Sequence, residues 1–401
     1  MAAELRAVWG LPAQEAHGRI IDISEAAVEL SAGSTRGGSV IGASIDARWA
    51  LRAAAGRAAD YPPDARPKAY AELAKALNAP EQGLVWCHGA SDVIVRVAAA
   101  AANRARSASS APIRVVRQDP SWPNADGLLR SGGMASIDPV PYPDPWGGGE
   151  EAAQVFWDAL TAQVLGDSPP ALVYLVHPHF PTGYKDPRFG QRLSDLVARC
   201  GDRKVLFSVD QTYLGFTLPT TEDDALLDAL GAKSESVVLI RSLSKVEGLA
   251  ALRLGYALAA PSTARELTEG LPFGGGLYVS ELALNGAVAA VCGAAAKRHG
   301  EAVRSFYHSE SARVCAELEE LGWEVSPSLC PFFCIRGPAA ALKAAFKAGV
   351  ALQSYTHPPL PSAGADDPDL DGKMGRAVCL VADRKSNQET VKALREAMEE
   401  Q

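Results

Sequence analysis

One lysine near the middle of the sequence lies at a predicted strand end, where its side chain could carry covalent chemistry. The β-branched run 236–240 predicts a strand, and the chain continues through Ser242, Ser244 and Lys245, with Arg253 eight residues later. A lysine can condense with an aldehyde to a Schiff base when burial and a nearby cation keep its amine unprotonated. Two hydroxyls and an arginine are good phosphate ligands. The segment therefore predicts a site for an aldehyde-bearing phosphate such as pyridoxal phosphate, against the alternative of a lysine on a solvated loop.

The strand predicted before this one supplies a second set of groups. Residues 205–209 run into Asp210, and Tyr213 follows three residues later. A carboxylate at a strand end can pair with a protonated pyridine nitrogen, which keeps the ring an electron sink. The Tyr213 hydroxyl can donate a hydrogen bond to the phenolic oxygen of the same ring. The Asp-x-x-Tyr spacing is weak by itself, and its value comes from lying one strand before the lysine.

These groups need strands that end at one edge of a sheet, and the sequence predicts such strands. Short runs rich in β-branched residues alternate with stretches that favour helices. The predicted strands cover residues 112–117, 171–176, 204–209, 236–240 and 253–259, with helices at 92–102 and 188–199. This alternation predicts an α/β fold with a mainly parallel sheet and helices on both faces. Sheets of this kind bind ligands at the carboxyl ends of their strands.

The chain divides into three predicted parts. Residues 1–45 form an N-terminal arm and a Gly/Ser-rich substrate loop, residues 46–270 a large cofactor-binding domain, and residues 271–401 a smaller α+β domain. A long helical stretch is predicted over 279–321. Surface loops rich in proline, glycine and aspartate are predicted at 139–151 and 358–372.

Composition excludes several classes of protein. The 401 residues are 47% apolar and 21% charged, which argues against a disordered or fibrous chain. The net charge of −8 argues against nucleic acid as a partner. The sequence has no apolar run of roughly 18 residues, as a membrane span needs, and its start lacks the pattern of a signal peptide. Seven irregularly spaced cysteines predict reduced thiols, mostly in the core, in a cytoplasmic protein, and no histidine has metal-ligand spacing.

The order of the motifs along most of the chain resembles a known group of enzymes. This group is the fold-type I pyridoxal-phosphate-dependent enzymes, and within it the class I/II aminotransferases. The residues that carry the resemblance are Asp210-x-x-Tyr213, then Ser242-x-Ser244-Lys245, then Arg253. The resemblance implies the aminotransferase fold, with a mainly parallel sheet in a large domain plus a smaller α+β domain, and pyridoxal 5'-phosphate as the cofactor.

Further segments carry the same resemblance. Residues 177–183 (His-Pro-His-Phe-Pro-Thr-Gly) resemble that group's Asn-Pro-x-Asn-Pro-Thr-Gly loop. Residues 119–124 are similar to the loop whose aromatic stacks on the pyridine ring in aspartate aminotransferases. Residues 88–92 resemble a phosphate-cradling turn at a helix start, where amides and the helix dipole favour an anion. Two more segments match, Asp60-Tyr61-Pro62 with 66–69 as in histidinol-phosphate aminotransferases, and Gly375-Arg376 as at the carboxylate-binding arginine.

The resemblance assigns a role to each matching position. Lys245 would form the Schiff base and move the proton on the substrate's α-carbon, Asp210 would keep the pyridine nitrogen protonated, and Tyr213 would hydrogen-bond the phenolic oxygen. Trp122 would stack on the ring and Arg376 would bind the substrate carboxylate. The implied phosphate ligands are Ala90, Ser91, Ser242, Ser244 and Arg253, with Tyr61 reaching across a homodimer.

Two departures fall on the substrate side of the cofactor. Phe180 stands where the group has an asparagine that hydrogen-bonds the phenolic oxygen, so the Schiff-base pKa should rise unless His177 or His179 supplies the missing donor. The N-terminal loop lacks the Glu-Asn-Pro-Tyr-Gly of histidinol-phosphate aminotransferases. It offers Glu25, Glu29 and Arg36 instead, which argues against histidinol phosphate as the substrate.

Three hypotheses follow. The first is an aminotransferase acting on an L-amino acid. The second is an enzyme of the same fold that performs elimination, replacement or cyclisation at the β- or γ-carbon, for example on an S-adenosylmethionine-like substrate. The third is a non-catalytic binding domain, which the intact lysine disfavours. Core packing is favoured over pocket lining for Phe332 and Phe333, and Arg241 and Glu247 are expected to be solvated.

Overall fold

The computed structural model describes the chain in segments. These are residues 42–55, 66–107, 113–142, 146, 149–217, 221–269, 271, 278–326, 328–347, 352–354, 374–381 and 383–399. Nearly all of the predicted arm, with Glu25, Glu29 and Arg36, lies outside them, as do Tyr61 and the loop predicted at 358–372. The division into parts at residues 45 and 270 stays a prediction.

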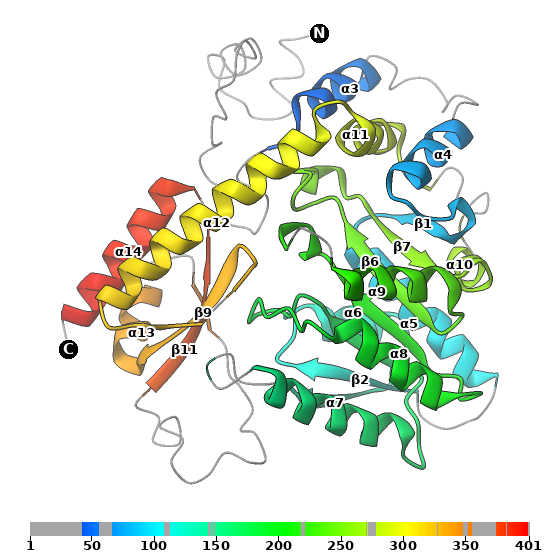
Figure 1. The fold of residues 1–401 in the computed structure, drawn as a ribbon, viewed down its shortest axis with the longest axis horizontal. Coiled ribbons are helices and arrows are strands. Elements are labelled where there is room, and N and C mark those ends of the chain that lie inside the picture. Colours follow the sequence, from blue (N-terminus) through cyan, green and yellow to red (C-terminus); the bar gives the residue numbers. More distant parts are fainter. Residues whose placement is uncertain are drawn as a thin grey trace.

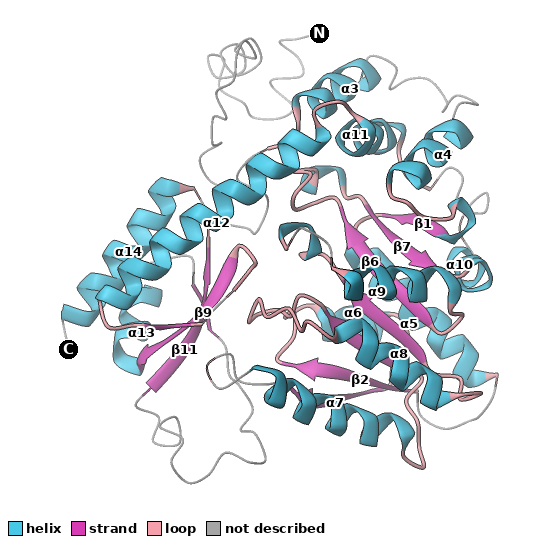
Figure 2. Ribbon diagram, in the orientation of Figure 1, coloured by secondary structure: helices cyan, strands magenta, loops and turns pink. Residues whose placement is uncertain are grey.

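A sheet of seven strands organises the larger part of the described chain (Figures 1 and 2). The strands are β1 (Leu84–Cys87), β2 (Arg114–Asp119), β3 (Ser136–Pro141), β4 (Leu172–Val176), β5 (Leu206–Asp210), β6 (Val237–Ser242) and β7 (Gly255–Ala259). Their order is β1-β7-β6-β5-β4-β2-β3. The strands from β6 to β3 run parallel, whereas β7 is antiparallel to both β6 and β1. This confirms the mainly parallel sheet.

The five predicted strands are present, and the structure adds β1 and β3. The prediction of a loop over 139–151 is wrong at both ends, because residues 139–141 complete β3 and residue 149 begins α7. The sequence predicted a loop there because β3 contains Pro139 and Pro141. It is an edge strand with a single neighbour, and an edge position tolerates prolines that donate no ladder hydrogen bond.

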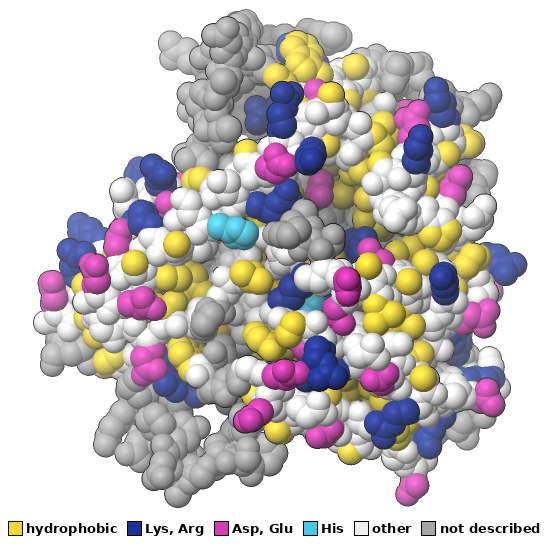
Figure 3. Space-filling view, in the orientation of Figure 1, with side chains coloured by type: hydrophobic (Ala, Val, Ile, Leu, Met, Phe, Trp, Pro, Cys, Tyr) yellow, Lys and Arg dark blue, Asp and Glu magenta, His cyan; other side chains and the backbone are white. Residues whose placement is uncertain are grey.

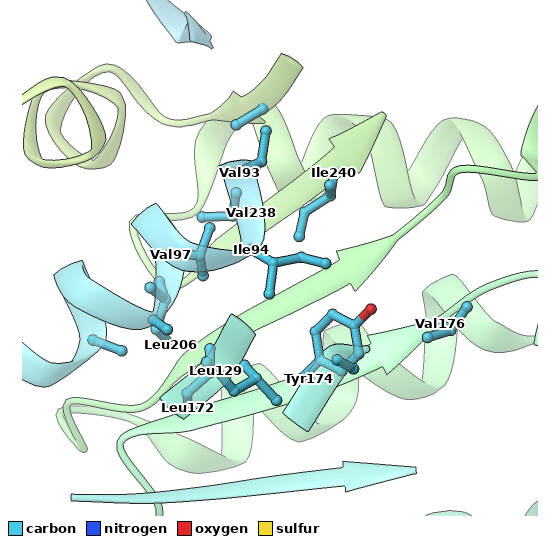
Figure 4. Packing of buried hydrophobic residues seen from close by; sticks show 14 of the residues in the cluster. Val93, Ile94, Val97, Leu129, Leu172, Tyr174, Val176, Leu206, Val238 and Ile240 are labelled. Carbon is cyan, nitrogen blue, oxygen red and sulfur yellow. The ribbon is translucent and has the colours of Figure 1, made fainter. Parts of the chain in front are cut away.

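Helices cover both faces of this sheet, which buries alternate side chains of each strand on opposite sides. One face packs against α5 (Ala90–Arg106), α6 (Ala125–Ser131) and α10 (Pro261–Thr268). The other packs against α7 (Gly149–Leu165), α8 (Phe189–Cys200) and α9 (Glu222–Lys233). Figure 4 shows Val93, Ile94 and Val97 of α5 over strand side chains that include Tyr174. Side chains on this α5 face therefore share one buried layer.

A second sheet forms the smaller α+β part. Its strands β8 (Glu324–Val325), β9 (Phe332–Pro338), β10 (Leu352–Ser354) and β11 (Met374–Leu380) are antiparallel in the order β10-β11-β9-β8. One face carries α12 (Ala296–Glu320), α13 (Ala339–Lys347) and α14 (Arg384–Glu399). The opposite face buries Phe332, Cys334 and Val378 in the same cluster as the α5 face of the large sheet. The small sheet therefore lies between its own helices and the large part.

The remaining helices pack beside β1 and β7. They are α3 (Ile45–Ala55), α4 (Arg66–Ala76) and α11 (Glu281–Cys292), with short 3-10 turns at Glu81–Gly83, Leu214–Phe216 and Ala250–Leu252. The helical stretch predicted over 279–321 is two helices, since α11 ends at Cys292 with Gly293 as its cap, and the Ala295 amide donates to Asp46 before α12 begins. Among the described helices, none has the length and apolar character needed to cross a membrane.

Candidate active site

Three loops meet at the carboxyl edge of the large sheet. In the strand register Val176 pairs with Asp210 and Asp210 pairs with Ile240, so the chain leaves β4, β5 and β6 side by side. The loop after β4 holds the Pro-Thr-Gly motif, the loop after β5 holds Tyr213, and the loop after β6 holds Lys245. Topology thus brings together residues that lie more than sixty positions apart in the sequence.

Asp210 ends β5 with its carboxylate on the α5 face. Its Oδ2 accepts a hydrogen bond from the Tyr174 hydroxyl at 3.0 Å, and its Oδ1 accepts from the Thr212 amide at 2.9 Å. Burial raises the pKa of the Asp210 carboxyl, while these two hydrogen bonds and the charge of Lys245 lower it in part. A fixed carboxylate in this setting can hold a proton on a ring nitrogen placed opposite it.

Lys245 lies on the tight loop that follows β6. Its Nζ is 5.0 Å from the centroid of the Tyr213 ring, within range of a cation–π contact. Burial lowers its pKa to about 8, helped by the charge of Arg253 and opposed by that of Asp210. At pH 7 roughly one amine in ten is then unprotonated, against roughly one in three thousand for an ordinary lysine. The side chain is therefore prepared for nucleophilic attack on an aldehyde, and the solvated-loop alternative is wrong.

The start of α5 forms a cradle for an anion. Gly89 precedes the helix at φ 81° with no side-chain cap, so the first helical amides, at Ala90 and Ser91, are available. A Cβ on Gly89 would stand 2.9 Å from Arg253 Nη2, and a Cβ on Gly255 would stand 2.8 Å from the Ala90 nitrogen. Only glycine at these two positions lets the guanidinium and β7 approach the helix start.

The predicted serines lie beside this cradle. Ser242 pairs with Gly255 across β6 and β7, and its Oγ accepts a hydrogen bond from the Ser244 amide at 3.1 Å. Ser244 is itself buried. The predicted phosphate ligands of the described chain therefore converge on one region, next to Lys245. This donor set of helix amides, hydroxyls and an arginine, with a lysine and a buried carboxylate beyond it, fits pyridoxal phosphate.

Three aromatic rings cluster next to Lys245. Phe180 is buried and lies parallel to Tyr213 at 6.3 Å between ring centroids. Phe332 of β9 meets Tyr213 edge-on at 4.8 Å and Phe180 at 5.0 Å. Burial raises the pKa of the Tyr213 hydroxyl, which stays a donor at neutral pH. The predicted tyrosine and the Phe180 departure thus form one cluster with a ring from the small sheet.

The two neighbouring histidines have other contacts in this structure. His179 Nδ1 lies 2.9 Å from the Thr182 hydroxyl and Nε2 lies 2.9 Å from the Pro120 carbonyl, so both ring nitrogens are engaged. His177 stacks on Phe189 of α8 at 4.1 Å, on the opposite face of the sheet, and burial lowers its pKa to about 4. The alternative in which His177 or His179 supplies the donor stays a prediction.

The remaining predicted residues lie around this centre. Trp122 packs on the apolar cluster that contains Phe180. Arg376 of β11 lies over the Trp146 ring at 5.7 Å, beside Arg336 at 5.1 Å, and Trp146 packs on the same cluster. The structure thus places Trp122 and Trp146 against this large apolar cluster and Arg376 against Trp146.

The prediction that Arg241 and Glu247 are solvated is wrong. Arg241 pairs with Asp228 of α9, and its Nε donates to the Gln211 side chain at 3.0 Å. Glu247 is half-buried, and burial raises its carboxyl pKa to about 7. Both residues flank Lys245 in the sequence, and the contacts of Arg241 come from α9 and from the loop after β5, so they follow from the tertiary fold.

Sequence reasoning missed Tyr174 and Trp146 and gave Phe332 only a core role. Tyr174 carried a signal, because one hydroxyl stands in an otherwise aliphatic strand and buried hydroxyls need partners. None of the seven cysteines forms a disulfide, and five of them are buried. Within the described residues, no cluster of three or more histidine, cysteine or acidic side chains could hold a metal. On the face seen in Figure 3, described side chains of both charges are interspersed.

Comparison with known proteins places the chain in a family. The family model for aminotransferases of class I and II matches residues 25–364. A histidinol-phosphate aminotransferase of Erythrobacter litoralis is 32% identical over 241 residues, which cover 59% of this chain and 57% of that protein. An aromatic amino acid aminotransferase of Cutibacterium acnes is 31% identical over 164 residues, or 40% of this chain and 43% of that protein. The alignments thus span less than two thirds of these relatives.

Solved structures show the same fold. A histidinol-phosphate aminotransferase of Sinorhizobium meliloti, in complex with pyridoxal-5'-phosphate, superposes with a TM-score of 0.70 at 20% identity, covering 91% of this chain and 90% of that one. A putative histidinol-phosphate aminotransferase of Erwinia carotovora atroseptica gives 0.70 at 19% identity, covering 91% and 95%. The fold expected from the sequence is confirmed.

Proposed function

Because this chain belongs to the aminotransferase class I and II family, we propose that it binds pyridoxal phosphate at Lys245 and transfers the amino group of an L-amino acid. One observation carries the proposal. Lys245 is a partly buried amine with a pKa lowered to about 8, placed near a buried carboxylate and an anion cradle.

The bound cofactor supplies an electron sink for the substrate's α-carbon. The chain's own residues do the rest. Asp210, held by Tyr174 and Thr212, keeps the proton on the ring nitrogen, and Lys245 Nζ moves the proton at the α-carbon. Tyr213 donates to the phenolic oxygen. The phosphate is bound by Ser242, Ser244, Arg253 and the amides of Ala90 and Ser91, and Trp122 stacks on the ring.

The proposal extends to the substrate and the assembly. Arg376 binds the α-carboxylate of the substrate through two parallel hydrogen bonds, which suits a planar guanidinium. Two copies of the chain form the active enzyme, with Tyr61 reaching the phosphate in the neighbouring copy, and the enzyme works in the cytoplasm. Gel filtration with light scattering tests the dimer, and a fully active monomer would refute it.

The experiment that tests the function is a visible spectrum of purified protein loaded with pyridoxal phosphate. Single L-amino acids are added in turn, and the released keto acid is quantified. We expect at least one amino acid to bleach the yellow band, shift absorption to that of pyridoxamine phosphate and release one equivalent of keto acid. A protein that takes up pyridoxal phosphate but responds to no amino acid would contradict a catalytic role.

A second function is kept because of Phe180 and its neighbours. Phe180 stands where the resemblance expects a polar donor, and it packs with Phe332 and Tyr213. The substrate side would then differ while the cofactor side keeps its predicted ligands. This favours elimination, replacement or cyclisation at the β- or γ-carbon as the alternative, for example on an S-adenosylmethionine-like substrate. In the same titration with S-adenosylmethionine, release of a leaving group or ammonia without pyridoxamine phosphate would select the alternative.

A further inference from the structure

One ring of the small sheet reaches into the site built by the large sheet. The Phe332 side chain is 1% exposed and is the shared edge-on partner of both Tyr213 and Phe180. The interplanar angles are 82° with Tyr213 and 65° with Phe180, which is the favourable edge-to-face geometry. Tyr213 in turn lies under Lys245 Nζ at 5.0 Å. The contacts therefore run from the small sheet, through Tyr213, to the lysine.

The position of Phe332 is fixed by its own loop and by the site loop. The Phe332 carbonyl accepts a hydrogen bond from Ser328 Oγ, and the Cys334 thiol donates to the Pro181 carbonyl at 3.5 Å. A Cβ on Gly183 would stand 1.8 Å from the same Ser328 Oγ, so the two loops are in direct contact. The Pro-Thr-Gly loop and β9 thus hold each other, with the Phe332 ring aimed at Tyr213.

The next residue of β9 provides an internal comparison. Phe333 is equally buried, at 1% exposure, but points to the other face of the small sheet. There it packs in the cluster with Trp323, Val391 and Leu394, against which Tyr213 also packs in part. The two phenylalanines are equally buried on one strand but face opposite sides of the small sheet. Of these two, Phe332 is the one whose ring meets Tyr213 and Phe180 edge-on.

We propose that Phe332 is a positioning residue that fixes the Tyr213 ring and, through it, the hydrogen bond from the Tyr213 hydroxyl to the cofactor's phenolic oxygen. The proposal rests on the proposed cofactor and the proposed role of Tyr213. Since Phe332 belongs to the small sheet and Tyr213 to the large one, the strength of that hydrogen bond depends on how the two sheets are seated. Because position 180 is a phenylalanine and offers no second donor, the phenolic oxygen depends more on the hydrogen bond from Tyr213.

The test is a pH titration of the visible absorption of protein loaded with pyridoxal phosphate. A hydrogen bond to the phenolic oxygen favours its deprotonated form, so a weakened bond raises the pKa of the chromophore. We expect Tyr213→Phe to raise this pKa by roughly one unit and Phe332→Leu by roughly half a unit. In the double variant Phe332→Leu should add nothing to Tyr213→Phe, because its effect passes through the hydroxyl.

Phe333→Leu is the matched control. It removes an equally buried ring and should lower the thermal midpoint about as much, yet leave the chromophore pKa unchanged. If Phe332→Leu does not fold, Phe332→Met keeps more of the volume without a ring and takes its place. An unchanged pKa in both Phe332 variants, or full additivity with Tyr213→Phe, would overturn the inference. Failure of the unmodified protein to take up pyridoxal phosphate would refute the proposed function instead.

Discussion

The two sides of the proposed cofactor position are formed by different kinds of residues. The phosphate side consists of helix amides, two serines and Arg253, all from the large sheet and α5. The ring-oxygen side consists of Phe180, Tyr213 and Phe332, drawn from both sheets. The first is polar and belongs to the large part alone, whereas the second is mostly aromatic, with the Tyr213 hydroxyl as its polar group, and joins the two sheets. We propose that the phosphate side determines binding and that the ring-oxygen side determines what happens to the bound substrate.

The largest effect is expected from removing the Lys245 amine, which lies between the two sides. In Lys245→Ala the amine is absent, so pyridoxal phosphate should bind without a covalent bond, and turnover should fall by roughly a thousandfold or more. Mass spectrometry after borohydride reduction measures the bond directly. Lys204→Ala, on an exposed loop, is the control and should keep full labelling. A reducible adduct that persists in Lys245→Ala would show that another lysine holds the cofactor.

The rate of cofactor uptake should depend on pH through Lys245. Only the unprotonated amine attacks the aldehyde, and the pKa is lowered to about 8, so the rate should rise roughly tenfold per pH unit below 8 and level off above it. Stopped-flow absorbance from pH 6 to roughly 9.5 measures this. Nα-acetyl-lysine in solution is the control, and its rate of reaction with pyridoxal phosphate should keep rising across the whole pH range.

Asp210→Asn sharpens the same experiment. The Asp210 charge raises the pKa of Lys245, so its removal should move the midpoint of the uptake profile to lower pH. A midpoint that moves upward would contradict the contact between these two groups.

On the phosphate side, Gly89→Ala should weaken pyridoxal phosphate binding roughly tenfold, or about 1.4 kcal/mol. The new Cβ would stand 2.9 Å from Arg253 Nη2, and the alanine backbone would have to adopt φ 81°. Gly149→Ala is the control, because Gly149 has φ 78° but nothing within 4 Å of an added Cβ. Equal loss of affinity in both variants would assign the effect to backbone strain instead of the cradle.

The smallest effect is expected on the ring-oxygen side. Phe180→Asn restores a donor for the phenolic oxygen and should lower the chromophore pKa by roughly half a unit to one unit. Phe180→Leu also removes the ring but adds no donor, and should not lower it. Spectroscopic pH titration of both variants decides the matter, and an unchanged pKa in Phe180→Asn would mean that position 180 does not face the phenolic oxygen.

The polar residues of the candidate site could be predicted from the sequence better than the contacts made by its aromatic rings. Asp210, Ser242 and Lys245 each follow a recognisable strand, so their convergence at one edge follows from a parallel sheet alone. The Tyr174–Asp210 hydrogen bond depends on the register of two strands, and the Phe332 contact depends on how the small sheet seats on the large one. Neither relation is local, so no periodicity in the sequence reports it.

The small sheet, which buries one face against its own helices and the other in the large cluster, has a consequence for how the chain folds. Phe332, Cys334 and Val378 are covered only once the large sheet exists. A fragment limited to the small sheet and its helices would present this face to water and would self-associate through it. We therefore expect the small part to fold onto the large one as a template, and the two to unfold in a single cooperative step.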